Sequence, residues 1–145
     1  MPLMRHPVAL ASAQGLVVPA FNIPYLPMVK PVVQAVVDCD CVAMLAVARL
    51  EWTKFEARGP AQVMDEYVKW ARPGYTFIHL DHVPVVDEDG LTVDYEPIIR
   101  EALAVGYQSV MIDGSRLPLA DNVAATRRVV DMAHAAGVPC EAELG

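Results

Sequence analysis

The chain lacks the features of a membrane protein and of a disulfide-bonded protein. Although 54% of its 145 residues are hydrophobic, no uninterrupted apolar run reaches the roughly 18 residues that a membrane-spanning helix requires. Three cysteines are an odd number without the spacing of a disulfide framework, so we expect buried free thiols. A proline and a histidine interrupt the N-terminal stretch where a secretory signal would need a continuous apolar segment. The sequence therefore predicts a cytoplasmic protein with no membrane partner.

Positive charge is also scarce. Eleven Lys and Arg residues face eighteen Asp and Glu residues, and the formal net charge is −7. The basic residues occur singly and form no stripe that could follow a phosphate backbone. We therefore expect no nucleic-acid partner. No low-complexity linker divides the chain, which predicts that residues 1–145 form one domain or part of one.

What the chain does contain is a repeated unit that starts at a glycine. Gly74, Gly106 and Gly137 are spaced by 32 and 31 residues, and Gly15 lies 59 residues before Gly74, close to two such periods. Each glycine precedes a short apolar run that is typical of a strand buried on both faces. The segment CVAMLAVAR at 41–49 fills the remaining position. A helix can end at such a glycine, because glycine readily adopts the left-handed conformation.

The apolar spacing between the strands is that of helices. In residues 122–137, for example, Val123, Thr126, Val130 and Ala133 share one helical face. Strands that alternate with helices predict a parallel sheet.

A period of about 31 residues matches the (β/α)₈ barrel, in which about 250 residues form eight units. The predicted fold is therefore α/β, a partial (β/α)₈ TIM barrel with about the first five strands and four helices. The main rival is a doubly wound open sheet, which usually carries a glycine-rich phosphate-binding turn after its first strand. Here that position holds NIPYLPM at 22–28, which favours the barrel.

Polar residues recur at one position after these glycines. Asn22, Asp81 and Asp113 each lie seven residues after a glycine, and Glu143 lies six after one. All four are expected at the carboxyl ends of strands, which open on the barrel face where active sites occur. Any one of them alone would more often be a turn or capping residue. Their repetition, with His82 beside Asp81, indicates a functional site.

The residue types at this mouth suit a metal site with a proton-transfer group. His82 and Glu143 offer a ring nitrogen and a carboxylate, which are ligands for a divalent ion such as Zn²⁺. Neighbouring strand residues point to opposite faces, so Asp81 and His82 can share the site only if the chain turns there, as Pro84 suggests. Asp81 would then lie beside the ion and move a proton. His79 is expected to be a hydrogen-bonded interior histidine.

Four segments resemble the class II ketose-bisphosphate aldolases, which include the fructose- and tagatose-bisphosphate aldolases. They are VPAFNI at 18–23, HLDHV at 79–83, the long and specific segment at 106–138, and EAELG at 141–145. The resemblance implies a metal-dependent, reversible aldol cleavage of a phosphorylated ketose, normally in a homo-oligomer. It makes Asp81 the catalytic acid/base, His82 a zinc ligand, and Glu143 a carboxylate that binds the metal in some states.

The resemblance also places Asp113 and Ser115 in a loop that lines the mouth, and we expect both of them, with Asn22, to bind substrate. Two segments depart from the family pattern where substrate commonly binds. They are PYLP at 24–27 and ARLEWTKFEARG at 48–59. The identity of the sugar phosphate is therefore left open.

The family's other histidine ligands and its glycine-rich phosphate loop would lie beyond residue 145. A catalytic zinc site needs three protein ligands, so we expect the isolated chain to be inactive. We also expect it to self-associate through open strand edges and apolar inner strand faces. Two alternatives remain: a non-catalytic half-barrel that serves as an assembly module, and a metal-independent barrel lyase. Residues 84–95 are expected to form an extra loop.

Overall fold

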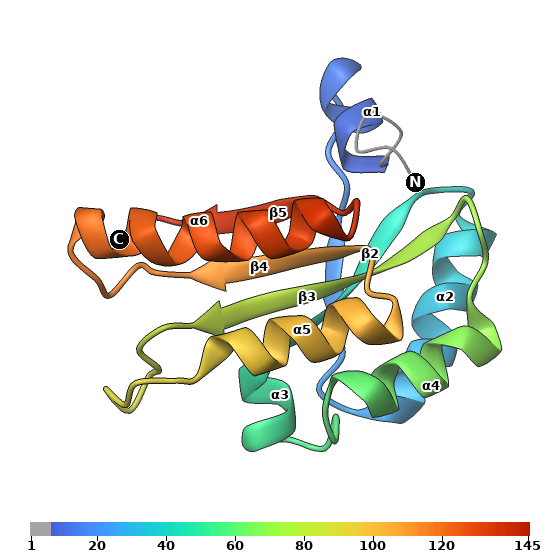
Figure 1. The fold of residues 1–145 in the computed structure, drawn as a ribbon. Helices are drawn as coiled ribbons and strands as arrows, with labels where there is room; N and C mark the ends of the chain where they lie inside the picture. Colours follow the sequence, from blue (N-terminus) through green and yellow to red (C-terminus); the bar gives the residue numbers. More distant parts are fainter. Residues whose placement is uncertain (1–6) are drawn as a thin grey trace.

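The computed structural model describes residues 7–145 and contains one parallel sheet. Its five strands pair in the order in which they occur in the chain, as Figure 1 shows. They are β1 (Ala20–Asn22), β2 (Ala43–Ala48), β3 (Thr76–Pro84), β4 (Ser109–Asp113) and β5 (Cys140–Glu143). A doubly wound sheet would reverse its strand order at one point, and this sheet does not. The predicted partial (β/α)₈ barrel is confirmed.

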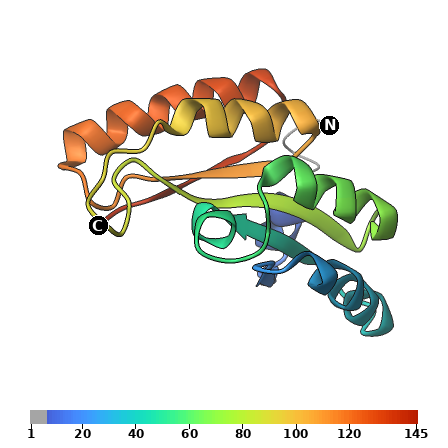
Figure 2. The same cartoon turned by 90° about the horizontal axis from the view of Figure 1, so that it is seen from below.

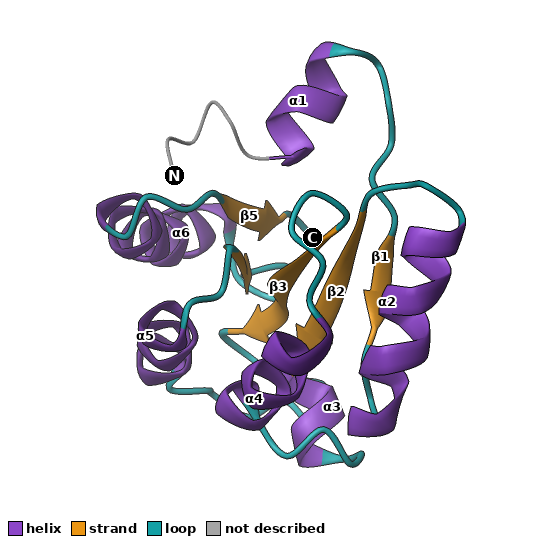
Figure 3. Cartoon of the chain, turned by 90° about the vertical axis from the view of Figure 1, so that its right-hand side faces the viewer, coloured by secondary structure: helices purple, strands orange, loops and turns teal. Residues whose placement is uncertain are grey.

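Four helices connect the strands, as predicted. They are α2 (Val29–Asp38), α4 (Pro60–Trp70), α5 (Tyr95–Val105) and α6 (Leu119–Ala135). The structure adds α1 (Pro7–Ala13), the 3₁₀ turn η2 (Leu26–Met28) and the short α3 (Arg49–Thr53). Figures 2 and 3 show the connecting helices along the outer side of a curved sheet, with α1 away from this layer. Such an arrangement is one sector of a barrel wall.

The hydrophobic core lies between the sheet and these helices. Alternate residues of the central strands pack against helix residues such as Val63 of α4 and Ile99 of α5, which are fully buried. Burial of one such side chain contributes about 1.5–3 kcal/mol. The strand residues of this core are Leu45, Val47, Ile78, Leu80, Val83, Val110 and Ile112. The aliphatic side chains of the strands therefore point outward, toward the helices.

The inner face of the sheet carries a different set of side chains. Across its centre, Ala46 pairs with His79 and His79 with Ser109, and Phe77 and Met111 lie on the same face. All five of these residues are buried. The prediction of inner strand faces rich in Val, Met, Ile and Leu was wrong for Val, Ile and Leu, whereas Met111 does lie there. Strand alternation places those residues on the side where the helices pack, so the inner face combines Ala46, Phe77 and Met111 with the polar His79 and Ser109.

Burial differs between the central and the outer strands. β2, β3 and β4 are almost entirely buried, as predicted, but all of β1 is exposed and β5 is exposed or half-buried. The two outer strands each have a neighbour on one side only, which explains their exposure. Cysteine burial was also predicted wrongly. The three thiols are free, but Cys39 is exposed, and Cys41 and Cys140 are half-buried.

The buried face of α6 differs from the predicted face, because most of its residues lie one position earlier in the sequence. The buried residues are Asn122, Ala125, Val129 and Ala133, whereas Val123 is 41% exposed. Asn122 accounts for the shift, because its Nδ2 donates a hydrogen bond to the backbone oxygen of Glu143 at 2.8 Å. This bond anchors the first turn of α6 to the end of β5, so a polar residue occupies the inward position.

The glycines behave as predicted at three of the repeats. Gly15, with φ 67°, follows the last turn of α1. α5 ends at Gly106, which is left-handed with φ 101°, and Gly137, with φ 75°, follows the last turn of α6. Gly74 also has a positive φ but lies in the turn beyond α4, whose C-cap is Ala71. It therefore serves the loop and not the helix end.

The predicted extra loop follows β3 and is fixed against α3. Within it, the Asp87 carboxylate accepts hydrogen bonds from two backbone N–H groups of the loop. Arg49, the first residue of α3, forms an ion pair with Asp87 at 3.3 Å, and Lys54 contacts Glu88 and Asp89 at 2.9 and 3.0 Å. The loop is thus held beside the carboxyl ends of β2 and β3.

Within residues 7–145 no helix has the length and apolar character to cross a bilayer. The stretch in which no secretory signal was expected falls partly on residues 1–6, which lie outside the described residues.

Candidate active site at the carboxyl ends of the strands

Asp81 and His82 share the mouth of the half-barrel because they lie in a bulge of β3, between Leu80 and Val83. Leu80 pairs with Val110 and Val83 with Ile112, so β3 has one residue more than β4 over this interval. His82 is the additional residue of the bulge. Its backbone φ is 36°, which is uncommon for a residue other than glycine. Bulges of this kind redirect side chains near active sites. The expected turn therefore exists, but Pro84 is not its cause, since β3 continues through Pro84.

Three potential metal ligands meet at this bulge. His82, Asp113 and Glu143 each offer one ligand atom, and these atoms lie within 4.8 Å of one another. Nδ1 of His82 is 3.4 Å from Asp113 Oδ2 and 3.3 Å from Glu143 Oε2. The ligands come from the ends of three successive strands, which parallel pairing brings to one edge. The sequence predicted Asp113 as a substrate contact, and the geometry adds it to the candidate ligands.

The surroundings of Glu143 fit a cation at this position. Its Oε2 atom is buried and, among the described residues, receives no hydrogen bond. A buried carboxylate oxygen without a donor is costly, and a cation between it, Asp113 and His82 would satisfy it. One nitrogen and two carboxylate oxygens form a donor set that suits Zn²⁺ and other divalent ions.

Ser115 is turned toward Asp113. Its backbone N–H and its hydroxyl both donate to Asp113 Oδ1, at 2.9 and 2.6 Å. This leaves Oδ2 of Asp113 directed at His82. The intervening Gly114 lies against the Asn122 side chain so closely that an added Cβ would overlap it. Ser115 therefore orients a carboxylate of the site, and its predicted contact with substrate stays a prediction.

Asp81 lies beside this group of ligands, between an amide and an imidazole. Asn22 Nδ2 donates to Asp81 Oδ2 at 3.3 Å, and His79 Nε2 lies 3.6 Å from Oδ1. Burial alone would raise the pKa of Asp81, but the close approach of His79 and the charge of His82 outweigh it, so the pKa is lowered. A carboxylate with a lowered pKa is ionised at neutral pH and can accept a proton.

His79 is the hydrogen-bonded interior histidine that the sequence predicted. It is 3% exposed, and its Nδ1 lies 2.7 Å from the hydroxyl of Ser109. Its Nε2 contacts Asp81 and also Glu141 Oε2, each at 3.6 Å. Sequence reasoning missed Glu141, although its position two residues before Glu143 places both side chains on one face of β5.

The imidazole of His82 and the carboxylate of Asp113 influence each other. Burial would lower the pKa of His82, but Asp81, Asp113 and Glu143 reverse that effect, and the pKa is raised. For Asp113, burial would raise the pKa, but the hydrogen bonds from Ser115 and the proximity of His82 lower it. The metal-free site thus favours a protonated His82 next to ionised carboxylates, and a bound cation would replace that proton.

A hollow of about 300 Å³ opens beside these residues. Its lining includes Asn22, His82 and Asp113 together with two guanidinium groups, Arg49 and Arg116. Arg49 is paired with Asp87, whereas Arg116 is exposed and has no ion-pair partner in the described part of the chain. Neither arginine was singled out from the sequence. The mouth therefore combines anionic candidate ligands with cationic groups at its rim.

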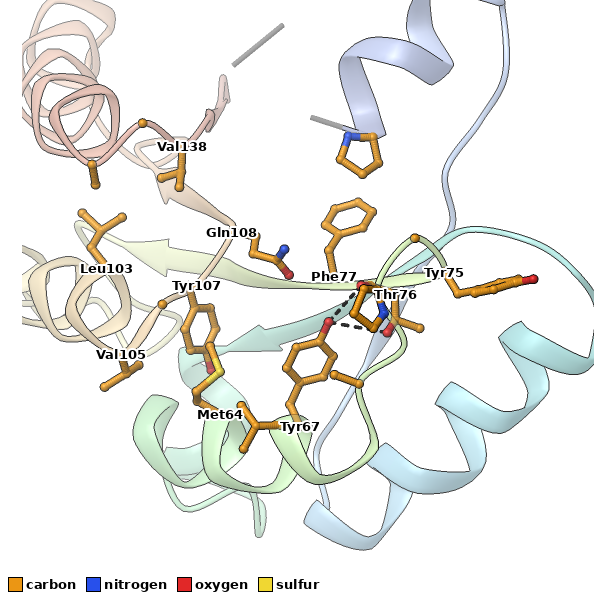
Figure 4. Close-up of a pocket in the computed structure, with 18 of the residues that line it drawn as sticks. Met64, Tyr67, Tyr75, Thr76, Phe77, Leu103, Val105, Tyr107, Gln108 and Val138 are labelled. Carbon is orange, nitrogen blue, oxygen red and sulfur yellow. Dashed lines mark hydrogen bonds between the residues drawn. The ribbon is translucent and has the colours of Figure 1, made fainter. Parts of the chain in front are cut away.

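A larger hollow, of about 740 Å³, lies at the opposite end of the strands. Figure 4 shows apolar and aromatic side chains around it, among them Tyr67, Phe77, Tyr107 and Val138. Among its polar groups, the Tyr67 hydroxyl is already bonded to the backbone oxygen of Thr76 at 2.9 Å. In (β/α)₈ barrels this end serves stability and the other end carries the chemistry, so the smaller hollow is the candidate active site.

Known proteins match the chain along most of its length. The family model described as fructose-bisphosphate aldolase class-II matches residues 4–145. A fructose-bisphosphate aldolase of Thermus caldophilus is 33% identical over 135 residues, which are 93% of this chain and 40% of that protein. One of Streptococcus pyogenes serotype M3 (strain ATCC BAA-595 / MGAS315) is 48% identical over 68 residues, 47% of this chain and 20% of that protein. The chain thus spans less than half the length of these relatives.

Solved structures agree with the fold. The YdjI aldolase of Escherichia coli K12 superposes with a TM-score of 0.75 and 23% identity, over 93% of this chain and 48% of that one. A fructose-bisphosphate aldolase of Campylobacter jejuni superposes with a TM-score of 0.69 and 18% identity, over 94% of this chain and 44% of that one. These likenesses establish the barrel architecture. Because the family model covers nearly the whole chain, the chain belongs to the class II fructose-bisphosphate aldolase family.

Proposed function

We propose that this chain supplies the metal-binding and proton-transfer part of a class II aldolase that reversibly cleaves a phosphorylated ketose. The observation that carries the proposal is the position of Asp81. Its carboxylate lies beside the group of His82, Asp113 and Glu143 without belonging to it. A base separate from the ligands remains free to move a proton while the ligands hold an ion.

Aldol cleavage needs a base at the hydroxyl group that becomes the new aldehyde. Asp81 accepts that proton and the carbon–carbon bond breaks. The electron pair of the broken bond moves toward the ketone carbonyl. His79 and Asn22 contact different oxygens of Asp81, so they orient the carboxylate. In the reverse direction Asp81 returns the proton.

His82, Asp113 and Glu143 would hold the metal ion, which we propose to be Zn²⁺. When bound, such an ion acts as a Lewis acid on the substrate carbonyl. Ser115 keeps Asp113 in its ligand orientation through two short hydrogen bonds. Asn122 holds the end of β5, and with it Glu143, in place. The chain thus arranges its three ligands before any ion binds.

A phosphorylated substrate is favoured by the two arginines at the mouth. Arg49 and Arg116 line the same hollow as His82, and guanidinium groups bind phosphate through several donors at once. Arg116, which has no ion-pair partner among residues 7–145, is the better candidate. The relatives named as fructose-bisphosphate aldolases support a sugar bisphosphate as the first substrate to test.

The experiment measures cleavage of fructose 1,6-bisphosphate with a coupled assay for triose phosphate. The 145-residue chain is assayed alone and after co-expression with the remaining C-terminal part of the Thermus caldophilus relative, so that a full barrel can assemble. We expect no turnover by the chain alone and zinc-dependent turnover by the assembled pair, abolished by a chelator. A matched pair that carries Asp81→Asn should be inactive but equally assembled.

The other outcomes separate the alternatives. Turnover that survives chelation would identify a metal-independent lyase. A stable complex without turnover on any ketose phosphate would contradict the proposed catalysis and favour an assembly module, for which the exposed strands β1 and β5 offer free edges. A homo-oligomeric, cytoplasmic enzyme remains the working proposal.

A further inference from the structure

The two carboxylates of the candidate metal site lie opposite each other on neighbouring strands. Asp113 and Glu143 are Cα partners in the pairing of β4 with β5, and they form the last pair of its register. Both carboxylates approach Nδ1 of His82, at 3.4 and 3.3 Å. Like charges at such short range repel each other. A further contact must therefore hold the two strand ends together until a cation binds.

β5 by itself gives Glu143 little support. The strand has four residues, all exposed or half-buried, and among the described residues it pairs only with β4. The contact at its end comes from α6, where Asn122 Nδ2 donates to the backbone oxygen of Glu143 at 2.8 Å. Asn122 is 3% exposed, and a buried hydrogen bond of this kind is costly to lose. The position of Glu143 thus depends on a side chain of another element.

The same amide also packs against the chain directly after Asp113. A Cβ added at Gly114 would overlap the side chain of Asn122, and a Cβ added at Gly145 would overlap the backbone oxygen of Ser115. The segments that follow β4 and β5 are therefore in close contact. The Asn122 side chain lies against the end of each strand and is shared by the two carboxylate-bearing segments.

Thr126 determines how this amide is turned. Its hydroxyl donates to Asn122 Oδ1 at 3.1 Å, from one turn further along α6. The oxygen of an amide accepts hydrogen bonds and its nitrogen donates them. An amide oxygen held by Thr126 therefore directs the Nδ2 donors toward Glu143. Thr126 is half-buried and has no part in the mechanism above.

We propose that Asn122, oriented by Thr126, is a positioning residue that holds Glu143 opposite Asp113 and so sets the separation of the two carboxylate ligands. The inference rests on the proposed metal site and extends it to α6, whose residues are not among the three candidate ligands. Without this amide the end of β5 can move away from β4, and the two carboxylates no longer fit one ion. The loss of contacts that orient ligands typically lowers metal affinity by about 10–100-fold.

The first test measures the zinc dissociation constant of the 145-residue chain by isothermal titration calorimetry. Asn122→Ala removes the donor and should weaken zinc binding by about 10–100-fold. Thr126→Val removes the hydroxyl at nearly constant volume, and it should weaken binding in the same direction but by less. Thr126→Ser keeps the hydroxyl and should restore the affinity of the parent chain.

Val129→Ala is the matched control for a purely structural role of Asn122. Val129 is fully buried on the same face of α6 but belongs to the hydrophobic core. Its truncation leaves a cavity and lowers Tm, whereas the zinc dissociation constant should stay at the parent value. A folded Asn122→Ala chain that binds zinc within about twofold of the parent, far short of the expected loss, would overturn the inference. Equal losses of affinity in Val129→Ala and Asn122→Ala would also overturn it.

The second test needs no metal. Hydrogen–deuterium exchange of the metal-free chain, read by mass spectrometry, reports how firmly residues 138–145 are held. This segment should exchange faster in Asn122→Ala and Thr126→Val than in the parent, and Val129→Ala should not open it selectively. Unchanged exchange in Asn122→Ala would refute the positioning role. If the parent chain binds no zinc, the proposed metal site fails, and the exchange result still decides whether Asn122 positions Glu143.

Discussion

Replacement of Glu143 by Gln tests the candidate metal site most directly. Glu143 is one of three potential ligands, and its side chain is 39% exposed. In the metal-free chain its contact with His82 is therefore worth about 0–1 kcal/mol, and Glu143→Gln should change stability by no more than that. Zinc at about a hundredfold its dissociation constant should stabilise the parent chain by about 2.7 kcal/mol, and thus raise Tm by about 5–11 °C. The variant should lose most of this increase.

Glu141→Gln is the matched control. Glu141 lies on the same strand and the same face but contacts His79, 3.6 Å away, and is not among the three ligands. Differential scanning calorimetry with and without zinc should therefore show the full increase for Glu141→Gln and little for Glu143→Gln. Equal increases in the two variants would refute the assignment of Glu143 as a ligand.

The same increase should depend on pH through His82. Its pKa is raised from the ordinary value of 6.5, and metal binding requires the neutral ring. The zinc-induced rise in Tm should therefore decline as the pH falls through this raised value. In the metal-free chain the sign is opposite: stability from charged His82 is complete below its unfolded pKa and is lost as the pH rises through the folded one. A zinc effect that is independent of pH would exclude His82.

Three further predictions concern the base, the backbone and the edges. Asp81→Asn in the assembled pair should lower turnover by about 10²–10⁴-fold with zinc content intact; a loss within about twofold would remove Asp81 from the mechanism. Gly106→Ala should destabilise the chain by about 1 kcal/mol or more in urea titrations. The cause is backbone strain at φ 101° and not a steric clash, since the nearest neighbour leaves room for a methyl group. An unchanged midpoint would refute this. The open edges of β1 and β5 should make the chain associate over about a hundredfold range of concentration, and a monomer throughout in sedimentation would contradict it.

The repeated strand-to-helix unit made the fold predictable. Glycines at regular spacing followed by apolar runs located four of the strands, and the gap in that spacing located β2, because glycine conformation and hydrophobic periodicity are local properties of the sequence. The same spacing located Asn22, Asp113 and Glu143 at the ends of their strands, whereas Asp81 lies three residues before the end of β3. Once parallel pairing is assumed, these positions must meet at one edge of the sheet.

The geometry within the mouth could not be read from the sequence. The bulge at His82, which turns two neighbouring residues to one side, arises from the pairing of β3 with β4 and has no local signal. The shift of Asp113 from substrate contact to candidate ligand depends on its distance from His82 and Glu143. Each of these requires contacts between residues far apart in the chain.

The sequence by itself determined the order of strands and helices and the residue types at the strand ends, because periodicity and glycine conformation act over a few residues. Only the tertiary structure decided which face of each strand meets the helices, how far the outer strands are buried, and which side chains share the site. The physical reason is that burial and side-chain partners are set by what packs against a segment. α6 shows this clearly: one bond from Asn122 to β5 rotated its buried face away from the face that hydrophobicity alone predicted.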